Sequence, residues 1–390
     1  MLKNFSFLLL FLFFTTGNAQ KKQLSVNAEI SVLTIAAGPD LNNAFGHSAF
    51  RIKDNDFDVI FDYGRFDFNA PNFYLNFVKG KLNYALGSNN FIDFLNYYTQ
   101  ENRSVKEQVL NLTGPEKQRV FNFLLNNYKP ENRNYLYEFF FDNCATKIRD
   151  VLQETLNHKV TFNPSKTFKN KSFRQLIHGN LIRNSWSCFG IDLALGAVID
   201  KRATVNEHLF LPKYVHAFFK KATIKGSNKN LVKQSHTLNK VNTRVSSNNI
   251  ITSPLVVFSI MGLIIIYISY INFKTNTRSR WLDIAIFSIT GFVGIIILLL
   301  WFATNHLGTH NNYNLLWAFA GNVLVLNQVF KPKPSIWFMG YLKLLAIMLC
   351  LLTVHWISGV QIYAVGLAPL LIALFIRYLF LIKFYNSKVK

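Results

Sequence analysis

The sequence predicts an α+β domain followed by an all-α membrane bundle of about five helices. Residues 20–249 are polar and mixed, whereas the chain from Ile250 onward consists of apolar blocks. Within the polar part, short Val-, Ile- and Phe-rich runs are interspersed with helical patterns. The chain has 390 residues, of which 50% are hydrophobic. Its polar region is long enough for one domain with a sizeable core.

Residues 1–19 have the pattern of a signal peptide. Lys3 supplies the positive charge, Phe5–Phe14 the apolar stretch, and Gly17-Asn18-Ala19 the small residues of a cleavage site. The polar domain is therefore expected outside the cytoplasm. An uncleaved segment would leave the domain on the same side.

The elements of the polar domain follow from local patterns. Strands rich in Val, Ile and Phe are expected first, and most helices after them. The predicted strands are 30–36, 49–53 and 59–63, and the predicted helices are 71–82, 91–100, 115–128 and 144–156.

Five apolar blocks predict the membrane spans. A span needs about 20 mainly apolar residues, and four of the blocks meet this length. The third block is shorter and contains Asn314, Asn322, Asn327 and Gln328, so a re-entrant passage is the alternative for it. The predicted spans are 251–273, 281–303, 313–330, 336–357 and 360–382.

Loop charges predict the orientation. With the domain outside, the cationic loop 274–280 lies inside, and the loop 304–312, which has no Lys or Arg, lies outside. Lys331, Lys333 and the basic tail 383–390 are cytoplasmic only if the third block crosses the membrane. We therefore expect a multi-pass protein of a bacterial inner membrane, with a periplasmic domain and a cytoplasmic C-terminus.

The net charge of +22 does not indicate a nucleic-acid partner. Many cations lie between and after the apolar blocks, where they orient helices. Lys343 and Arg377 are expected to snorkel toward the cytoplasmic surface. The basic stretch from Lys213 to Arg244 is interpreted either as a contact with anionic lipids or as a solvated juxtamembrane linker.

Cys144 has the sequence setting of a nucleophile. It follows Asp142 and Asn143, which are natural N-caps, and so falls in the first turn of a predicted helix. The positive end of the helix dipole favours a thiolate there, and His47 is the candidate base. The alternatives are a buried structural cysteine and a core histidine. A disulfide between Cys144 and Cys188 is also open.

A carboxylate is expected to orient His47. If residues 54–57 form a tight hairpin, His47 lies opposite Gly64 or Tyr63, with Asp62 diagonal to it on the same face. A slip of one residue would reverse the face. Asp62 is therefore the first choice, and Tyr63 the second. A salt-bridged surface aspartate is the alternative.

The remaining histidines do not predict a metal centre or another cofactor. His306 and His310 are four residues apart in the expected outer loop, but no third ligand is evident nearby. Contact with a lipid or peptide head group at the outer membrane surface is the preferred interpretation for this pair.

Several motifs resemble one family. The order of a histidine strand and then a cysteine helix resembles the circularly permuted papain-like superfamily, near the NlpC/P60 peptidases and the lecithin:retinol acyltransferase-like enzymes. A closer resemblance, over nearly the whole chain, is to the Lnb-type lipoprotein N-acyltransferases. It is carried by Phe45–Arg51, Asp62–Phe68, Pro71–Tyr74 with Lys79-Gly80, Pro130–Tyr135, Asp142–Thr146, Phe189–Leu193 with Gly196 and Asp200, and Asn314–Trp317.

The resemblance implies acyl transfer from a membrane phospholipid to the N-terminal amine of a diacylated lipoprotein. Cys144 would form the thioester, and His47 would move the protons. The backbone N–H of Cys144 and the side chain of Asn143 would stabilise the oxyanion. The other candidates for substrate binding are Tyr63, Arg133, His306 and His310.

Two other functions remain open from the sequence. A periplasmic cysteine peptidase or amidase acting on peptidoglycan or peptides would use the same Cys144 and His47. A non-enzymatic membrane module would instead pair Cys144 with Cys188 in a disulfide.

Overall fold

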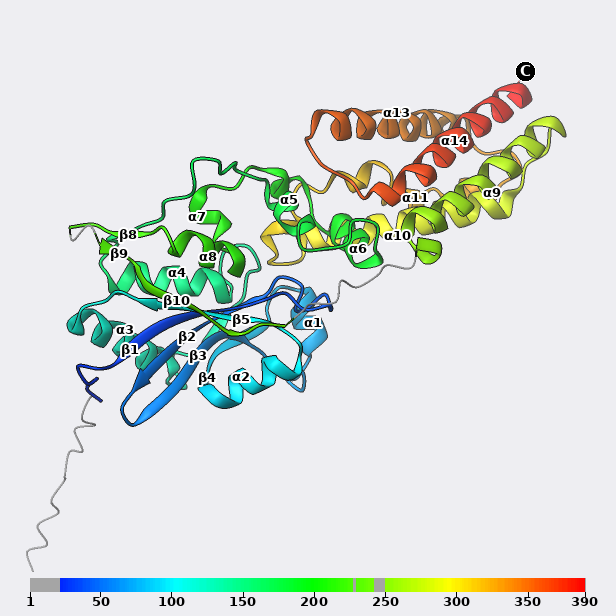
Figure 1. Cartoon of the computed structure of the whole chain (residues 1–390). Coiled ribbons are helices and arrows are strands. Elements are labelled where there is room, and N and C mark those ends of the chain that lie inside the picture. The colour runs from blue at the N-terminus through cyan, green and yellow to red at the C-terminus, as the bar shows by residue number, and fades with distance from the viewer. Residues whose placement is uncertain (1–21, 227–228, 242–249, 390) are drawn as a thin grey trace, which may run out of the picture.

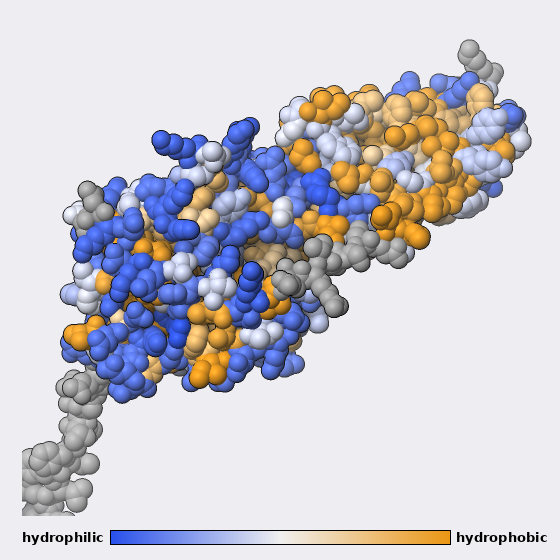
Figure 2. All heavy atoms as spheres, in the orientation of Figure 1, coloured by the Kyte–Doolittle hydropathy of each residue, from blue (hydrophilic) through white to orange (hydrophobic). Residues whose placement is uncertain are grey.

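A computed structural model describes residues 22–226, 229–241 and 250–389, without the side chains of residues 388 and 389. The expected signal peptide, residues 1–19, lies outside this range. An α+β domain sits at one end of a helical bundle (Figure 1). Hydrophobic residues cover much of the bundle's surface, and hydrophilic residues cover most of the domain (Figure 2). This contrast confirms the predicted division between a polar domain and a membrane region.

The domain is built on a seven-stranded antiparallel sheet with the strand order β10-β5-β1-β2-β3-β4-β6. Its central strands are buried on both faces. Ile30 and Val32 of β1 belong to the core on one face, and Leu33 and Ile35 belong to the core on the other. The strands are β1 Glu29–Ile35, β2 His47–Asp54, β3 Phe57–Arg65, β4 Asn83–Asn90, β5 Val105–Leu110, β6 Asn134–Leu136 and β10 Val232–Asn239; a small second sheet has β7 Val160–Thr161, β8 Thr223–Ile224 and β9 Lys229–Asn230.

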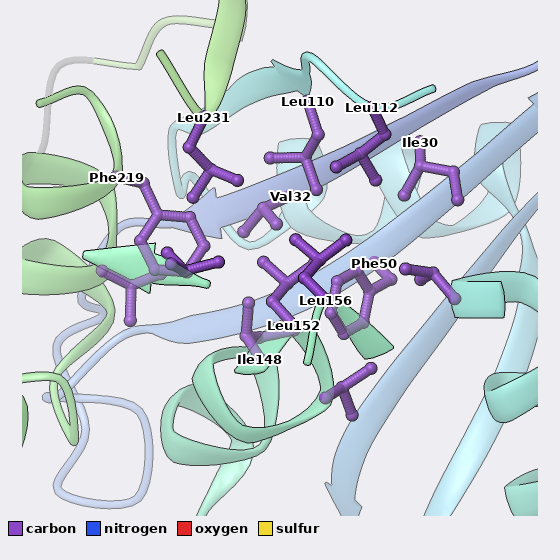
Figure 3. Packing of buried hydrophobic residues seen from close by; sticks show 14 of the residues in the cluster. Ile30, Val32, Phe50, Leu110, Leu112, Ile148, Leu152, Leu156, Phe219 and Leu231 are labelled. Atoms are coloured by element: carbon purple, nitrogen blue, oxygen red, sulfur yellow. The ribbon is translucent and has the colours of Figure 1, made fainter. Parts of the chain in front are cut away.

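Helices cover both faces of the large sheet. On one face, Ile148, Leu152 and Leu156 recur every four residues along one side of α4 and pack against Val32 and Phe50 (Figure 3). Burying each such side chain contributes about 1.5–3 kcal/mol. Helix α2 covers the other face. The helices are α1 Phe73–Val78, α2 Phe91–Gln100, α3 Gly114–Tyr128, α4 Cys144–Thr155, α5 Phe173–His178, α6 Trp186–Ala194, α7 Val205–His208 and α8 Pro212–Phe219.

The structure differs from the sequence-based elements in two regions of the domain. The expected helix 71–82 is shorter, because Gly80, with φ of 65°, turns the chain after α1 and β4 begins at Asn83. The basic stretch is largely folded, since α8 begins at Pro212 and β10 forms an edge strand. Residues 242–249 of the expected linker lie outside the described residues.

Four helices of the described chain are long and apolar enough to cross a membrane. The expected third span over 313–330 is not one continuous helix: it consists of a 3₁₀ helix at Tyr313–Leu316 and two short α-helices. The helices of this region are α9 Pro254–Lys274, α10 Arg280–Phe302, α11 Gly321–Leu324, α12 Leu326–Phe330, α13 Ile336–Ser358 and α14 Ala368–Val389.

Parts of the broken third block are nevertheless packed inside protein, although Leu324 and Phe330 are exposed. The side chain of Asn322 donates to Thr290 at 2.8 Å and accepts from Tyr341 at 2.6 Å. Gly294 of α10 lets the irregular backbone approach closely, since a Cβ there would lie 2.2 Å from the carbonyl oxygen of Ala318. Irregular backbone is tolerated at membrane depth only where it is buried in this way.

This block also runs from the domain to the far end of the bundle. Near its start, Asn314 donates to the carbonyl of Asp192 in the domain at 3.0 Å. Near its end, the carbonyl of Val329 accepts from Arg278, in the loop between α9 and α10, at 2.9 Å. The α9–α10 loop and Lys331 therefore share one end of the bundle, as the loop charges predicted.

Arg377 does not snorkel to the surface. Its side chain is fully buried and pairs with Asp283, with 2.7 Å between Nε and Oδ1. Asn272 accepts a further hydrogen bond from it at 2.9 Å. Burying a charge at this depth is tolerated because a carboxylate and polar groups surround it. Lys343, by contrast, is exposed.

The loop between α10 and α11 fastens the domain to the bundle. The N–H of Gly196 donates to Gly308 at 3.0 Å, and the N–H of Ala197 donates to Asn311 at 2.9 Å. A Cβ at Gly196 would lie 1.9 Å from the carbonyl oxygen of His310, so only glycine permits this contact. The domain is therefore held directly on the outer end of the bundle.

Candidate active site

Cys144 is the first residue of α4, and Asn143 caps this helix. The side-chain oxygen of Asn143 accepts from the N–H groups of Ala145 at 2.8 Å and Thr146 at 2.9 Å. Thr146 returns the interaction by accepting from the N–H of Asn143 at 2.7 Å. This reciprocal cap fixes where the helix starts and so places Cys144 at the positive end of its dipole.

The side-chain nitrogen of Asn143 donates two hydrogen bonds to backbone carbonyls. It donates to the carbonyls of Phe139 and Phe210, both at 2.8 Å. Both of its hydrogens are therefore used, and Asn143 is not free to donate to a substrate oxyanion as the sequence suggested. The backbone N–H of Cys144, for which the described residues supply no hydrogen-bond acceptor, is the free donor at this helix start.

His47 and Asp62 are brought together by the β2–β3 hairpin. The strands pair Asp54 with Phe57 and Phe50 with Phe61, and this register continued places His47 opposite Gly64. The Nε2 atom of His47 lies 3.2 Å from Oδ2 of Asp62. The diagonal contact expected from the sequence is present, and the imidazole ring is held through Nε2.

Asp62 also binds Arg65, a residue that the sequence analysis did not single out. Nε of Arg65 donates to Oδ1 of Asp62 at 2.8 Å, so the two carboxylate oxygens face different cations. Arg65 packs against Gly87 of β4, where a Cβ would be only 2.1 Å from its Nε. Burial would raise the pKa of Asp62, but His47 and Arg65 outweigh it and lower the pKa.

The thiol of Cys144 lies close enough to His47 to influence the pKa of the imidazole. Burial disfavours the imidazolium, but Tyr98, Cys144 and Asp62 together raise the pKa of His47 well above its usual value. Burial also raises the pKa of Tyr98, which keeps its phenol neutral near pH 7. Asp62, whose Oδ2 lies 3.2 Å from Nε2, is therefore the carboxylate that favours a proton on His47. Because Nε2 contacts Asp62, Nδ1 is the ring nitrogen that is available to exchange a proton with the thiol of Cys144.

Gly64 of β3 lies beside the start of the cysteine helix. Its φ of 94° suits glycine, and a Cβ there would lie 3.7 Å from the Cβ of Cys144. The same point lies 3.8 Å from the ring of Tyr137 and 4.0 Å from the hydroxyl of Tyr135. The Tyr135 hydroxyl is buried and has no hydrogen-bond partner among the described residues. Such a group beside the thiol is a candidate donor to a substrate.

Two residues predicted to bind substrate make other contacts in the structure. Tyr63 is buried in the main core, and its hydroxyl donates to Asn127. Burial raises its pKa. Tyr63 therefore does not orient His47, and only Asp62 remains for that role. Arg133 is exposed, and its carbonyl accepts from Leu86 at 2.9 Å.

The outer-loop histidines lie where the domain meets the bundle. Nε2 of His306 is 2.9 Å from the carbonyl oxygen of Phe77, at the end of α1. The carbonyl group of His310 packs closely against Gly196. Gly308, between them, packs against Phe140, which precedes the cysteine helix. These residues thus fasten the bundle beside the segment that leads to Cys144.

Cys188 belongs to a separate buried cluster with His178 and Asp192, whose ligand atoms lie close enough together to suggest a metal site. However, Arg174 donates to Asp192 at 2.8 Å, and Arg183 contacts Nδ1 of His178. Because these guanidinium groups occupy the carboxylate and the imidazole, the cluster fits an ion-pair network better than a metal centre.

The thiols are not cross-linked. Cys144, Cys188 and Cys350 are all free, so the structure contains no Cys144–Cys188 disulfide. Burial, followed by the charge of Asp192, raises the pKa of Cys188 to about 12. Cys188 therefore stays a neutral thiol near pH 7, which makes it a poor nucleophile.

Two family models match the chain. The Lnb N-terminal periplasmic domain matches residues 17–178, and the Lnb transmembrane domain matches residues 246–388. The chain belongs to the Lnb family. Comparisons with curated proteins and with solved structures give no match. As in the Lnb architecture, a periplasmic domain precedes a transmembrane domain, which indicates an inner-membrane protein. His47, Asp62 and Cys144 all lie in the part that matches the Lnb periplasmic domain.

Proposed function

We propose that this protein is a membrane-bound lipoprotein N-acyltransferase. It would move an acyl chain from a phospholipid to the N-terminal amine of a diacylated lipoprotein through a thioester on Cys144. The observation that carries the proposal is the placement of a Cys144–His47–Asp62 constellation in a domain fastened to the outer end of a membrane bundle. Both substrates reside in the membrane, so a fixed position at its surface suits this reaction.

At the start of the reaction, the proton of Cys144 resides on His47, and the two side chains form an ion pair. The thiolate attacks the ester carbonyl of the phospholipid and forms a carbon–sulfur bond. The tetrahedral intermediate then breaks the bond to the glycerol oxygen, and the imidazolium of His47 returns its proton to that oxygen. The products are an acyl-Cys144 thioester and a lysophospholipid.

In the second half, the neutral amine of the lipoprotein attacks the thioester. His47, now neutral, accepts a proton from the attacking nitrogen, and the carbon–sulfur bond breaks. The lipoprotein leaves as an amide, and Cys144 and His47 return to the ion pair. Asp62 keeps the imidazole ring of His47 in position and stabilises the imidazolium in both halves of the reaction.

The oxyanion of each tetrahedral intermediate needs donors close to the Cys144 sulfur. The free N–H of Cys144 at the start of α4 is the first. The Tyr135 hydroxyl supplies the second, because it is buried, unpartnered and next to Gly64 and Cys144. Donors already in place and shielded from water stabilise charge without reorganisation.

A cysteine peptidase or amidase is the second candidate, because the same Cys–His–Asp arrangement also cleaves amides. The fastening of the domain to the bundle favours acyl transfer, since a peptidase acting on soluble peptides has no need of it. The two candidates differ in product: one lengthens lipoproteins by an acyl group, and the other releases peptides.

The test is expression of the wild type and of Cys144→Ser in a bacterial host that lacks lipoprotein N-acylation. Mass spectrometry of lipoprotein N-termini should show an added acyl chain with the wild type and none with Cys144→Ser. Cys188→Ser is the matched control and should retain acylation. Lipoproteins that stay diacylated with wild-type protein would refute the proposal, and acylation by Cys144→Ser would refute the thioester.

We also infer that the C-terminus is cytoplasmic. The α9–α10 loop and Lys331 lie at the bundle end opposite the domain, and this shared cationic end favours the cytoplasm. A C-terminal fluorescent-protein fusion should be fluorescent, and a C-terminal alkaline phosphatase fusion should be inactive. The reverse pair of results would contradict this orientation.

A further inference from the structure

Five aromatic rings form a continuous series between α1 and the cysteine helix. The ring centroids are 6.5 Å apart for Phe77 and Phe73, and 5.8 Å apart for Phe73 and Phe66. They are 5.2 Å apart for Phe66 and Tyr84, and 4.2 Å apart for Tyr84 and Tyr137. We call this series the aromatic tract.

The inner end of the aromatic tract lies beside the nucleophile. The ring of Tyr137 and the Cβ of Cys144 flank Gly64, at 3.8 and 3.7 Å from the position a Cβ would take there. Tyr84 stacks on Tyr137 and is itself buried. An apolar chain that follows these rings therefore ends beside Cys144.

The outer end of the tract is exposed. Phe77, its outermost ring, is 51% exposed, and the neighbouring Phe68 and Tyr74, which contact Phe73, are 61% and 76% exposed. Leu75 and Val78 of the same segment are also exposed. Apolar side chains gathered in this way on one short segment usually mark a contact surface.

The exposed end is continuous with the membrane bundle. The carbonyl of Phe77 contacts His306, and the carbonyl of Lys79 accepts from the N–H of Asn305 at 2.9 Å. His306 and Asn305 belong to the loop that follows α10. The last residue of α10, Phe302, is 72% exposed. Figure 1 shows α1 on the side of the domain that faces the bundle. The outer end of the tract is thus held at the level where the bilayer begins.

We propose that the aromatic tract guides the acyl chain of a bilayer phospholipid from the outer leaflet to Cys144. The inference rests on the proposed acyltransferase function. Moving an acyl chain out of the bilayer exposes its methylene groups to water, which is unfavourable. A line of aromatic faces between the leaflet and the thiol removes much of that penalty. A purely structural cluster would not need three large aromatic side chains pointing into solvent.

The experiment compares two acyl donors with full-length protein in liposomes. One donor is a long-chain phosphatidylethanolamine in the bilayer, and the other is a short, water-soluble thiophenyl ester. The readout is the rate at which the Cys144 thioester forms. The variants are Phe77→Ser at the outer end and Phe66→Ala in the middle. Ile92→Ser is the control, because Ile92 is 63% exposed on α2, outside the tract.

We expect each tract variant to lower the rate with the phospholipid about tenfold and to leave the rate with the soluble ester unchanged, as for contacts in a hydrophobic site. Ile92→Ser should change neither rate. An equal loss with both donors would assign the tract a structural role and overturn the inference, as would an unchanged phospholipid rate. A loss seen only with Phe77→Ser would also overturn the inference, because Phe77 would then be a surface contact and not part of a path to Cys144. Failure of the wild type to form any thioester would instead contradict the proposed function.

Discussion

The Nε2 atom of His47 and the Oδ2 atom of Asp62 lie 3.2 Å apart across the β2–β3 hairpin. The other carboxylate oxygen of Asp62 faces Arg65. The histidine is therefore oriented by a carboxylate that is itself fixed, and Arg65 is a positioning residue that acts through Asp62. This chain of contacts leads to two predictions about pH.

Asp62→Asn should slow the reaction and change its pH profile. The substitution keeps the shape of the side chain but removes the charge, so the pKa of His47 should fall toward its usual value. We expect the rate of thioester formation to drop about 10²-fold or more. The alkaline limb of the pH–rate profile should move to lower pH, because His47 loses its proton earlier. Asp58→Asn, which removes a partner of Arg51 on the same hairpin, is the control. An unmoved alkaline limb would count against Asp62 as the orienting group.

The same pair should make stability depend on pH. The folded pKa of His47 is raised above 6.5, so its contribution is complete below about pH 6.5 and is lost as the pH rises through the folded value. The folded pKa of Asp62 is lowered below 3.8, so its contribution is present above that value and is lost as the pH falls through the folded pKa. The melting temperature of the wild type should exceed that of His47→Gln most between about pH 4 and 6.5. A difference that grows in alkali would contradict this sign.

Local chemistry explains which parts of the site the sequence could predict. The contact of His47 with Asp62 follows from the alternation of β2 and β3 and from the tight turn at Asn55 and Asp56. The helix start at Cys144 follows from the capping chemistry of Asn143. Both depend on residues close together in the chain or on one hairpin.

The remaining features depend on distant segments. Both amide hydrogens of Asn143 are used, and one of their acceptors is Phe210, far along the chain. The hydroxyl of Tyr135 stands beside Cys144 because β6 pairs with β4 at the sheet edge, and neither of these strands was predicted. In the broken third membrane block, Asn322 has its partners on α10 and α13. No local pattern encodes such partners.

Asp283→Asn should destabilise the membrane bundle more than Arg377→Met. Asp283 is fully buried and pairs with both Arg278 and Arg377, each at 2.7 Å. Removing its charge leaves two guanidinium groups uncompensated, and breaking a buried pair typically costs about 3–5 kcal/mol. Arg377→Met leaves Asp283 paired with Arg278, so its loss should be smaller. The measurement is thermal unfolding of the full chain in detergent, with the exposed Lys343→Gln as the control. Equal melting temperatures for the two variants would argue against a shared network.

Two tyrosines near Cys144 should respond in opposite ways to the loss of their hydroxyls. The Tyr135 hydroxyl is buried without a partner, which costs free energy in the folded state, so Tyr135→Phe should leave stability unchanged or raise it. If that hydroxyl stabilises the oxyanion, the rate of thioester formation should fall about 10²-fold. The Tyr63 hydroxyl donates to Asn127 in the core. Tyr63→Phe should therefore lower stability by about 1 kcal/mol and leave the rate nearly unchanged. Thermal unfolding and thioester kinetics on the same preparations separate the two effects. A Tyr135→Phe protein with full activity would remove Tyr135 from the mechanism and leave the N–H of Cys144 as the donor.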